Sequence, residues 1–271
     1  MRTYFFGDIH GNGYALERCL AHLDEVKPDQ VYCLGDLVGW LPFGDRSLRR
    51  MRALDFPTVA GNHDLLVAGL ITDHPEQLDR MQATAYNAGL LSSYPGAIDY
   101  LRNLPLALEA DDFTVVHHSP FDLPPPGQAP TIACFNYLDD LALDQSLMAW
   151  RRYAKRLIFS GHDHLPAVFE LLDHRSPEPR VYRPSAAQSL TLRLHQDARY
   201  WIKVGSVGGP YRDNTAVANT ALYDSEAQTI TLFRLPYPTQ PLRLELESHI
   251  FLGNLATIRR YRQLLSQPVS S

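Results

Sequence analysis

Side chains of the kinds that bind metals follow the ends of several short apolar runs in this sequence. Ligands of α/β proteins bind outside the carboxyl ends of the strands, so side chains placed just beyond several strand ends are expected to converge on one region. Glycines that precede these groups let the backbone turn sharply and keep bulk away from the site. The side chains placed in this way are Asp8, His10, Asp36, Asn62, His63, His117, His162 and His164.

The donor types in this set indicate a pair of divalent ions. Imidazoles, carboxylates and an amide oxygen suit borderline ions such as manganese, iron and zinc. No cysteine belongs to the set, which argues against a structural zinc site. The donors are too many for one open catalytic ion, and they suit two ions about 3.5–4 Å apart that share a carboxylate and a water. Such a pair lowers the pKa of the shared water toward about 7 and stabilises the oxygens of an in-line displacement.

The elements that must position these groups alternate between strands and helices in the first third of the chain, which predicts βαβ units. The predicted strands are 3–6, 30–34 and 57–60, and the predicted helices are 14–26 and 45–54. Further predicted elements are a helix at 75–92, strands at 113–118 and 155–164, a helix at 139–154, mostly strands beyond residue 165, and a last helix at 248–265.

The bulk properties predict a single cytoplasmic domain. A chain of 271 residues that is 45% hydrophobic can bury a full core, and no linker divides it, so 1–271 is interpreted as one domain. Within it, 119–155 is expected to form a rim loop and a helical insertion, and 248–271 a C-terminal helix and tail. The net charge of −5 gives no broad basic field, so nucleic acid is not expected as a partner.

The cysteines and the apolar runs indicate the cellular compartment in which the protein is expected. Cys19, Cys33 and Cys134 are odd in number and widely spaced, which is typical of reduced thiols in the cytosol. The first apolar run is too short for a signal peptide, and no run reaches the roughly 18 apolar residues of a spanning helix. We therefore expect no membrane partner and a cytoplasmic protein.

The ordered blocks GDIHG, GDLVG, GNHD, a strand ending in histidine, and GHDH resemble the calcineurin-like metallophosphoesterases. The later segment VGSVGGPYRDN (204–214) resembles a further segment of the bacterial branch, so the resemblance covers most of the chain. The resemblance implies a four-layer αββα sandwich of two mixed β-sheets flanked by helices. It also implies that Asp8, His10, Asp36 and His164 bind one metal, and that Asp36, Asn62, His117 and His162 bind the other, with Asp36 bridging.

The same resemblance implies the activity, which is hydrolysis of phosphoester bonds by attack of a metal-bridging hydroxide. His63 is then no ligand but the general acid that protonates the leaving oxygen, and Asp64 orients its ring. The segment through Trp40 resembles small bacterial phosphodiesterases and dinucleoside polyphosphate hydrolases, and lacks the Asp-Arg-Gly of serine/threonine phosphatases. The expected substrate is a small phosphodiester or nucleotide-type molecule. Among cofactors, manganese is expected first, and iron, zinc, cobalt or nickel suit the same donors.

Several assignments keep an alternative. Strand alternation sends His117 and His118 to opposite sides, and only the family pattern selects His117 as the ligand. His118 is therefore assigned to the substrate pocket. Asn12 is assigned to a substrate oxygen because it lies just past the first block, although the residue type favours the alternative, a turn or helix-start role. Arg212 is assigned to a substrate phosphate, with a solvated loop position as the alternative.

Two other functions fit the same fold. They are a non-catalytic metal-binding scaffold for protein partners and a metal-dependent nuclease. The complete set of expected ligands favours catalysis over the scaffold, and the acidic balance argues against the nuclease.

The Pro-rich loop 121–130 is interpreted as a pocket rim because it closely follows a ligand.

Overall fold

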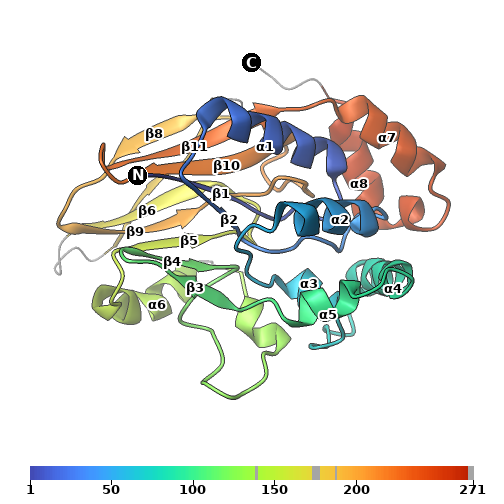
Figure 1. The fold of residues 1–271 in the computed structure, drawn as a ribbon, viewed down its shortest axis with the longest axis horizontal. Helices are drawn as coiled ribbons and strands as arrows, with labels where there is room; N and C mark the ends of the chain where they lie inside the picture. The colour runs from blue at the N-terminus through green and yellow to red at the C-terminus, as the bar shows by residue number, and fades with distance from the viewer. Residues whose placement is uncertain (138–139, 173–177, 187, 268–271) are drawn as a thin grey trace.

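The computed structural model describes residues 1–137, 140–172, 178–186 and 188–267, which form two β-sheets packed face to face between outer layers of helices (Figure 1). The first sheet has the strand order β2-β1-β10-β11-β8, and the second has the order β3-β4-β5-β9-β6-β7. Strands β1 and β2 run parallel, as do β4, β5 and β9, and the other pairs are antiparallel. The predicted α/β sandwich of two mixed sheets is confirmed.

The strand bounds are as follows. The first sheet contains β1 (Arg2–Phe6), β2 (Gln30–Cys33), β8 (Leu190–Arg193), β10 (Val217–Asp224) and β11 (Thr229–Pro236). The second sheet contains β3 (Ala107–Glu109), β4 (Phe113–Val116), β5 (Leu157–Ser160), β6 (Ala167–Leu172), β7 (Arg180–Tyr182) and β9 (Ala198–Lys203).

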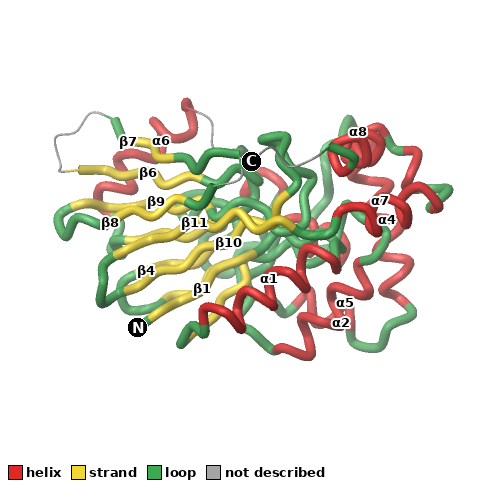
Figure 2. The backbone as a smooth tube through the Cα atoms, turned by 90° about the horizontal axis from the view of Figure 1, so that it is seen from above, coloured by secondary structure: helices red, strands yellow, loops and turns green. Residues whose placement is uncertain are grey.

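The helices gather mainly at one end of the sandwich, where the first strands of the chain also end (Figure 2). The helices are α1 (Gly13–Val26), α2 (Gly44–Leu54), α3 (Asn62–Val67), α4 (Leu78–Ser92), α5 (Ala97–Arg102), α6 (Asp140–Arg152), α7 (Thr239–Ser248) and α8 (Ala256–Leu265). Two short 3₁₀ turns are Ile132–Phe135 and Leu252–Asn254. No helix among the described residues is long and apolar enough to cross a bilayer.

The core follows from the alternation of side chains along β1. Successive residues of a strand face opposite sides, so Phe5 points between the sheets and Tyr4 points toward α1. Between the sheets, the rings of Phe5 and Phe159 stack with their centroids 3.7 Å apart. On the far side of the second sheet, Trp150 of α6 packs edge-on against Trp201 of β9, at 6.0 Å. The central strands β1, β4, β5 and β9 are therefore buried almost throughout, whereas the edge strands β3, β7 and β8 are partly exposed.

Some predicted elements differ from the structure. The predicted strand at 57–60 contains only an isolated bridge between Cys33 and Thr58. The predicted helix 248–265 is present only from Ala256 to Leu265, as α8, and α7 ends at Ser248 before it. Gly253 lies in the break, where a Cβ would be 2.6 Å from the Leu246 carbonyl oxygen, so the chain turns closely over the end of α7. The short elements β3, β7, α3 and α5 were not predicted.

Three further predictions concern α6, the C-terminal tail and the cysteines. Helix α6 agrees with the prediction of 139–154 within the described residues, and its predicted start at 139 lies outside them. The last four residues of the predicted tail, 268–271, also lie outside the described residues. Cys19, Cys33 and Cys134 are free thiols, as the sequence predicts.

Candidate metal centre

The seven predicted metal ligands come together where the strands end. Asp8 and His10 follow β1, Asp36 follows β2, and Asn62 opens α3. His117 follows β4 and His162 and His164 follow β5, which runs parallel to β4. All seven side chains are buried, with exposed fractions between 0% and 5%. The predicted convergence of these residues therefore occurs in the fold.

The first donor group joins Asp8, His10, His164 and Asp36. The Nε2 atoms of His10 and His164 lie 3.1 Å apart. Asp8 Oδ1 lies 3.4 Å from His164 Nε2, and Asp36 Oδ2 lies 3.5 Å from His10 Nε2. Two imidazole nitrogens and two carboxylate oxygens therefore face one point, which suits a divalent borderline ion.

The second donor group joins Asp36, Asn62, His117 and His162. Asp36 Oδ2, the oxygen that faces His10, also lies 3.3 Å from His117 Nε2. Asn62 Oδ1 lies 3.2 Å from His117 Nε2 and 3.0 Å from His162 Nδ1. A single carboxylate oxygen thus belongs to both groups, which is the arrangement expected of a bridging ligand between two ions.

Backbone carbonyls fix the orientation of three of the histidine rings. The Nδ1 atoms of His10, His117 and His164 lie 3.2, 2.6 and 2.7 Å from the carbonyl oxygens of Val38, Leu34 and Pro210. A carbonyl oxygen only accepts hydrogen bonds, so each Nδ1 carries the proton and each Nε2 offers its lone pair to the centre. This second layer of contacts supports metal binding by the three rings.

Five of the seven residues have left-handed backbone conformations, namely Asp8, His10, Asp36, His162 and His164, with φ between 51° and 67°. This region is sparsely populated by residues other than glycine, and each instance costs about 1–3 kcal/mol. Neighbouring glycines make room for the carboxylates. A Cβ on Gly61 would lie 2.0 Å from Asp36 Oδ1, and one on Gly161 would lie 2.2 Å from Asp8 Oδ2. Strain and close approach are thus concentrated at the predicted ligands.

Burial and neighbouring charge give the histidines different proton affinities. Burial lowers the pKa of His10 and of His162 well below the usual 6.5, so both are neutral near pH 7 and free to bind a metal. Burial also acts to lower the pKa of His117, but the charge of Asp36 and a hydrogen bond to it raise that pKa to about 9. In the metal-free protein, His117 therefore carries a second proton, on Nε2, at pH 7 and is positively charged.

We expect metal binding at the second donor group to displace that proton. Below the His117 pKa of about 9 the proton competes with the metal, so the affinity should rise with pH, by up to about tenfold per unit between pH 7 and 9, and level off above it. NMR titration of the metal-free protein should give His117 a midpoint near pH 9. A midpoint at or below 6.5 would contradict the paired arrangement of His117 and Asp36.

His63 lies beside the centre, but Asp64 does not contact it in the predicted way. The His63 ring is 4.7 Å from the His10 ring, and its Nδ1 has no hydrogen-bond partner among the described residues. The Asp64 carboxylate instead accepts hydrogen bonds from backbone N–H groups of Asp36, Leu37, Val38 and Gly61, at 2.7 to 3.4 Å. The prediction that Asp64 orients the His63 ring is therefore wrong for this structure. Asp64 holds the loop that carries Asp36.

Other contacts position His63. Its backbone N–H donates to Asp36 Oδ1 at 2.8 Å, and its ring packs against the Trp40 ring at 5.2 Å. Gly39, at φ +129°, lies directly beneath the ring, where a Cβ would be 2.4 Å from His63 Nδ1. Donor atoms of His10, Asp36 and His63 also lie within 4.8 Å of one another, so distance alone admits His63 as a ligand.

Asn12 is part of the scaffold. It is fully buried, and its Oδ1 accepts from the Ala15 N–H as the N-cap of α1. Its Nδ2 lies 3.1 Å from the Gly208 carbonyl oxygen and from the hydroxyls of Tyr237 and Tyr261. Both ends of the amide are occupied, so the predicted contact with a substrate oxygen is wrong and the helix-start alternative describes this residue.

His118 and Arg212, both assigned to the substrate pocket, differ in the residues that they contact beside the centre. His118 is buried and turns from His117 toward Asp122, with 3.4 Å between Nε2 and Oδ2. The Arg212 guanidinium lies 4.1 Å from the centroid of the Tyr137 ring, which in turn stacks on the His162 ring at 5.2 Å. The Tyr137 ring, in the rim insertion, therefore lies between Arg212 and the second donor group.

Tyr137 and Trp40 were not predicted as site residues. Both are aromatic residues in segments that border a ligand block, but nothing in the local sequence says that their rings reach His162 and His63. Only the folded loops bring these rings to the centre.

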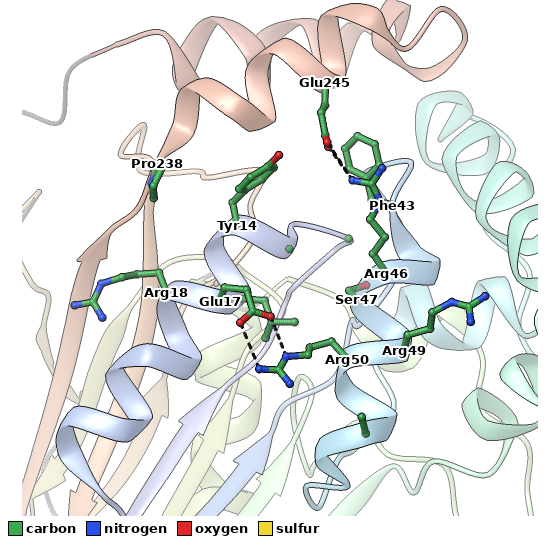
Figure 3. A pocket seen from close by; sticks show the side chains of 14 residues that line it. Tyr14, Glu17, Arg18, Phe43, Arg46, Ser47, Arg49, Arg50, Pro238 and Glu245 are labelled. Atoms are coloured by element: carbon green, nitrogen blue, oxygen red, sulfur yellow. Dashed lines mark hydrogen bonds and ion pairs between the residues drawn. The ribbon is translucent and has the colours of Figure 1, made fainter.

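Two cavities lie near these loops, and no predicted metal ligand lines either of them. A cavity of about 800 Å³ is bordered by Trp40 and Pro210, which contact His63 and His164 respectively. The other, of about 750 Å³, lies between α1, α2 and α7 (Figure 3). None of the predicted ligands lines it, and its Arg46 and Arg50 are paired with Glu245 and Glu17. The first cavity is therefore the one whose lining residues contact His63 and His164.

Known proteins resemble this chain in sequence and fold. The uncharacterized protein MJ0912 of Methanocaldococcus jannaschii is 28% identical over 244 residues, which cover 85% of each chain. A symmetrical bis(5'-nucleosyl)-tetraphosphatase of Janthinobacterium sp. is 35% identical over 125 residues, but this match covers only 43% of each chain. The crystal structure of a metallophosphoesterase from Sphaerobacter thermophilus shares the fold, with a TM-score of 0.74, 24% identity, and coverage of 97% of this chain and 98% of that one.

The sequence model of the family described as calcineurin-like phosphoesterase matches residues 1–166, which is more than half of the chain and contains every one of the seven converging donors. This chain therefore belongs to the calcineurin-like phosphoesterase family.

Proposed function

We propose that this protein hydrolyses a phosphoester bond in a small nucleotide-type substrate with the help of two divalent ions. The observation that carries the proposal is the position of Asp36 Oδ2, which lies within 3.5 Å of His10 Nε2 and of His117 Nε2. One ion would be held by Asp8, His10, His164 and Asp36. The other would be held by Asn62, His117, His162 and the same Asp36. We infer that the whole chain acts as one domain, because the ligands come from both sheets.

Two ions held in this way would lower the pKa of a shared water and neutralise charge on the phosphoryl oxygens. The chain itself supplies the orientation. The carbonyls of Val38, Leu34 and Pro210 hold three histidines in the tautomer that faces the centre. Manganese is our first choice of ion, and iron, zinc, cobalt and nickel suit the same nitrogen and oxygen donors.

His63 is proposed as the general acid that protonates the leaving oxygen. Its ring is buried beside His10, and its Nδ1 has no partner among the described residues. Burial lowers the pKa of His63 to about 4 in the free protein, so the ring is neutral at pH 7. A bound phosphate adds negative charge beside the ring, which favours the protonated form. Asp64 acts indirectly, through the loop that carries Asp36.

The proposed substrate class is dinucleoside polyphosphates or related small phosphodiesters. Support comes from the partial match to a relative named as a symmetrical bis(5'-nucleosyl)-tetraphosphatase. The match spans less than half of that relative, so the substrate must be determined directly.

The direct test is a substrate panel run with each metal separately. Phosphomonoesters, phosphodiesters and dinucleoside polyphosphates are offered to the purified protein with manganese, iron, zinc, cobalt, nickel or magnesium. We expect turnover of diesters and dinucleoside polyphosphates with manganese, and none after chelation. Two bound metals without turnover of any phosphoester would overturn the proposal in favour of a non-catalytic scaffold.

A further inference from the structure

The cavity beside the metal centre is formed by segments that are far apart in the sequence. Its wall combines Trp40, the loop 210–214 and one face of α8, and its volume is about 800 Å³. Two of its wall residues contact the centre: the Trp40 ring lies 5.2 Å from the His63 ring, and the Pro210 carbonyl accepts from His164 Nδ1 at 2.7 Å. A molecule whose reacting bond lay at the metals would extend into this cavity on the His63 side.

The cavity wall is cationic, although the protein as a whole carries a net charge of −5. Arg212 and Arg260 both line it, and no aspartate or glutamate does. The other lining side chains with hydrogen-bonding groups include Asn214, Thr257 and Gln263, which are uncharged. The wall therefore attracts an anion and offers neutral donors and acceptors around it.

Arg260 differs from the neighbouring arginines of α8. Arg259 donates to the Asn254 carbonyl oxygen at 2.8 Å, and Arg262 donates to the Gly253 carbonyl oxygen at 3.3 Å. Arg260 is exposed, and within the described part of the chain its guanidinium makes no hydrogen bond or ion pair. Five N–H donors are thus available on the wall of a cavity that adjoins a phosphoesterase centre.

The size and chemistry of the wall restrict the ligand. Small-molecule sites occupy about 300–1,000 Å³, so this cavity is much larger than one phosphate group needs. A guanidinium binds phosphate oxygens with two parallel hydrogen bonds. A tryptophan ring packs against other flat rings. A nucleoside phosphate combines these properties, because it carries an anionic group, hydroxyls and a flat base.

We propose that this cavity binds the nucleoside phosphate portion of the substrate that leaves when the bond is cleaved, with Arg260 bound to a phosphate beyond the scissile one and Trp40 packed against the base. The inference rests on the proposed function, since it places the leaving portion on the side of His63. It also assigns the C-terminal helix α8 to substrate selection, in a region beyond the family match at residues 1–166.

The first test compares two substrates in the metal-loaded, full-length protein. Arg260→Gln removes the charge and keeps most of the side-chain length. We expect it to raise KM for a dinucleoside tetraphosphate by about tenfold or more, and to change kcat/KM for bis(p-nitrophenyl) phosphate by less than about twofold. The small diester has no second phosphate for Arg260 to bind. Arg259→Gln, on the same helix and outside the cavity, should change neither value.

The second test measures binding without turnover. The α,β-methylene analogue of ADP is titrated into the metal-loaded protein by calorimetry, with Arg260→Gln and Trp40→Leu as variants. We expect both variants to bind the analogue more weakly and Arg259→Gln to bind it as the unmodified protein does.

The outcomes separate the two proposals. Equal effects of Arg260→Gln on both substrates, or no effect on either substrate and on analogue binding, would overturn the nucleotide subsite while leaving the phosphoesterase intact. Analogue binding that depends on Arg260, in a protein that hydrolyses neither substrate, would support the subsite and overturn the proposed function. Absence of both turnover and analogue binding would overturn both.

Discussion

Replacing Asp36 with asparagine is expected to abolish metal binding at both positions together. The Oδ2 atom of Asp36 lies 3.5 Å from His10 Nε2 and 3.3 Å from His117 Nε2, so one neutralised group weakens two sites. Mutation of a residue that only hydrogen-bonds to a metal ligand costs about 10–100-fold in metal affinity, and loss of a ligand should cost more. We therefore expect a loss of more than about 100-fold at each position, and no measurable phosphoester turnover.

Elemental analysis of the purified variant, with the metals reported per chain, is the measurement. Asp24→Asn on the exposed side of α1 is the matched control and should keep the metal content of the unmodified protein. Circular dichroism checks that Asp36→Asn still folds. Two metals retained by Asp36→Asn would refute the bridging role, and loss of only one would confine Asp36 to a single position.

Replacing His63 with alanine is expected to leave the metals bound and to slow the reaction. Positioned acid catalysis contributes about 10²–10⁴-fold, so turnover of substrates with alkyl or nucleoside leaving groups should fall by that amount. A p-nitrophenolate leaving group departs without a proton, so p-nitrophenyl esters should be affected far less. The pattern expected is thus a change in kcat that grows with the pKa of the leaving group.

The metal content of His63→Ala distinguishes the general-acid role of His63 from a role as a metal ligand. Donor atoms of His63 lie within 4.8 Å of those of His10 and Asp36, so a ligand role would appear as metal loss in His63→Ala. Exposed His74→Ala is the matched control and should keep both metals and full activity. Equal slowing of all substrates with full metal occupancy would count against the acid and indicate a positioning role.

The convergence of the metal donors could be predicted from sequence because it depends on local signals. Gly-Asp and Gly-His pairs mark the ends of buried strands, and parallel strands such as β1 and β2 end at the same edge. Asp8 and Asp36 therefore lie close together, just beyond these two strand ends. The choice of His117 over His118 followed the family pattern, and in the structure His117 faces Asn62 while His118 faces Asp122.

The contacts around the donors could not be predicted because they depend on loop geometry. Asp64 follows His63 directly in the sequence, but its carboxylate turns to the backbone N–H groups of Asp36 and Gly61. Asn12 follows the first block, yet the fold surrounds its amide with Tyr237 and Tyr261 from the other end of the chain. Partners separated by more than 200 residues leave no local signal in a single sequence.

In the C-terminal region, the placement of a whole helix could not be predicted from the sequence. Apolar spacing over 248–265 is helical, but the chain turns at Gly253 and forms a separate α8 that lines the cavity beside Trp40. The position of Arg260 on that wall follows from the turn. Prediction from periodicity gives the presence of a helix, whereas its place against a distant loop is set by tertiary packing.

The central claim is that the strand ends hold two metal ions with Asp36 between them. Anomalous X-ray scattering from crystals of the manganese-loaded protein, recorded on both sides of the manganese absorption edge, tests it directly. We predict two peaks about 3.5–4 Å apart, one beside His10 and His164 and the other beside Asn62 and His117, with the Asp36 carboxylate between them. A single peak, or peaks remote from Asp36, would contradict the account.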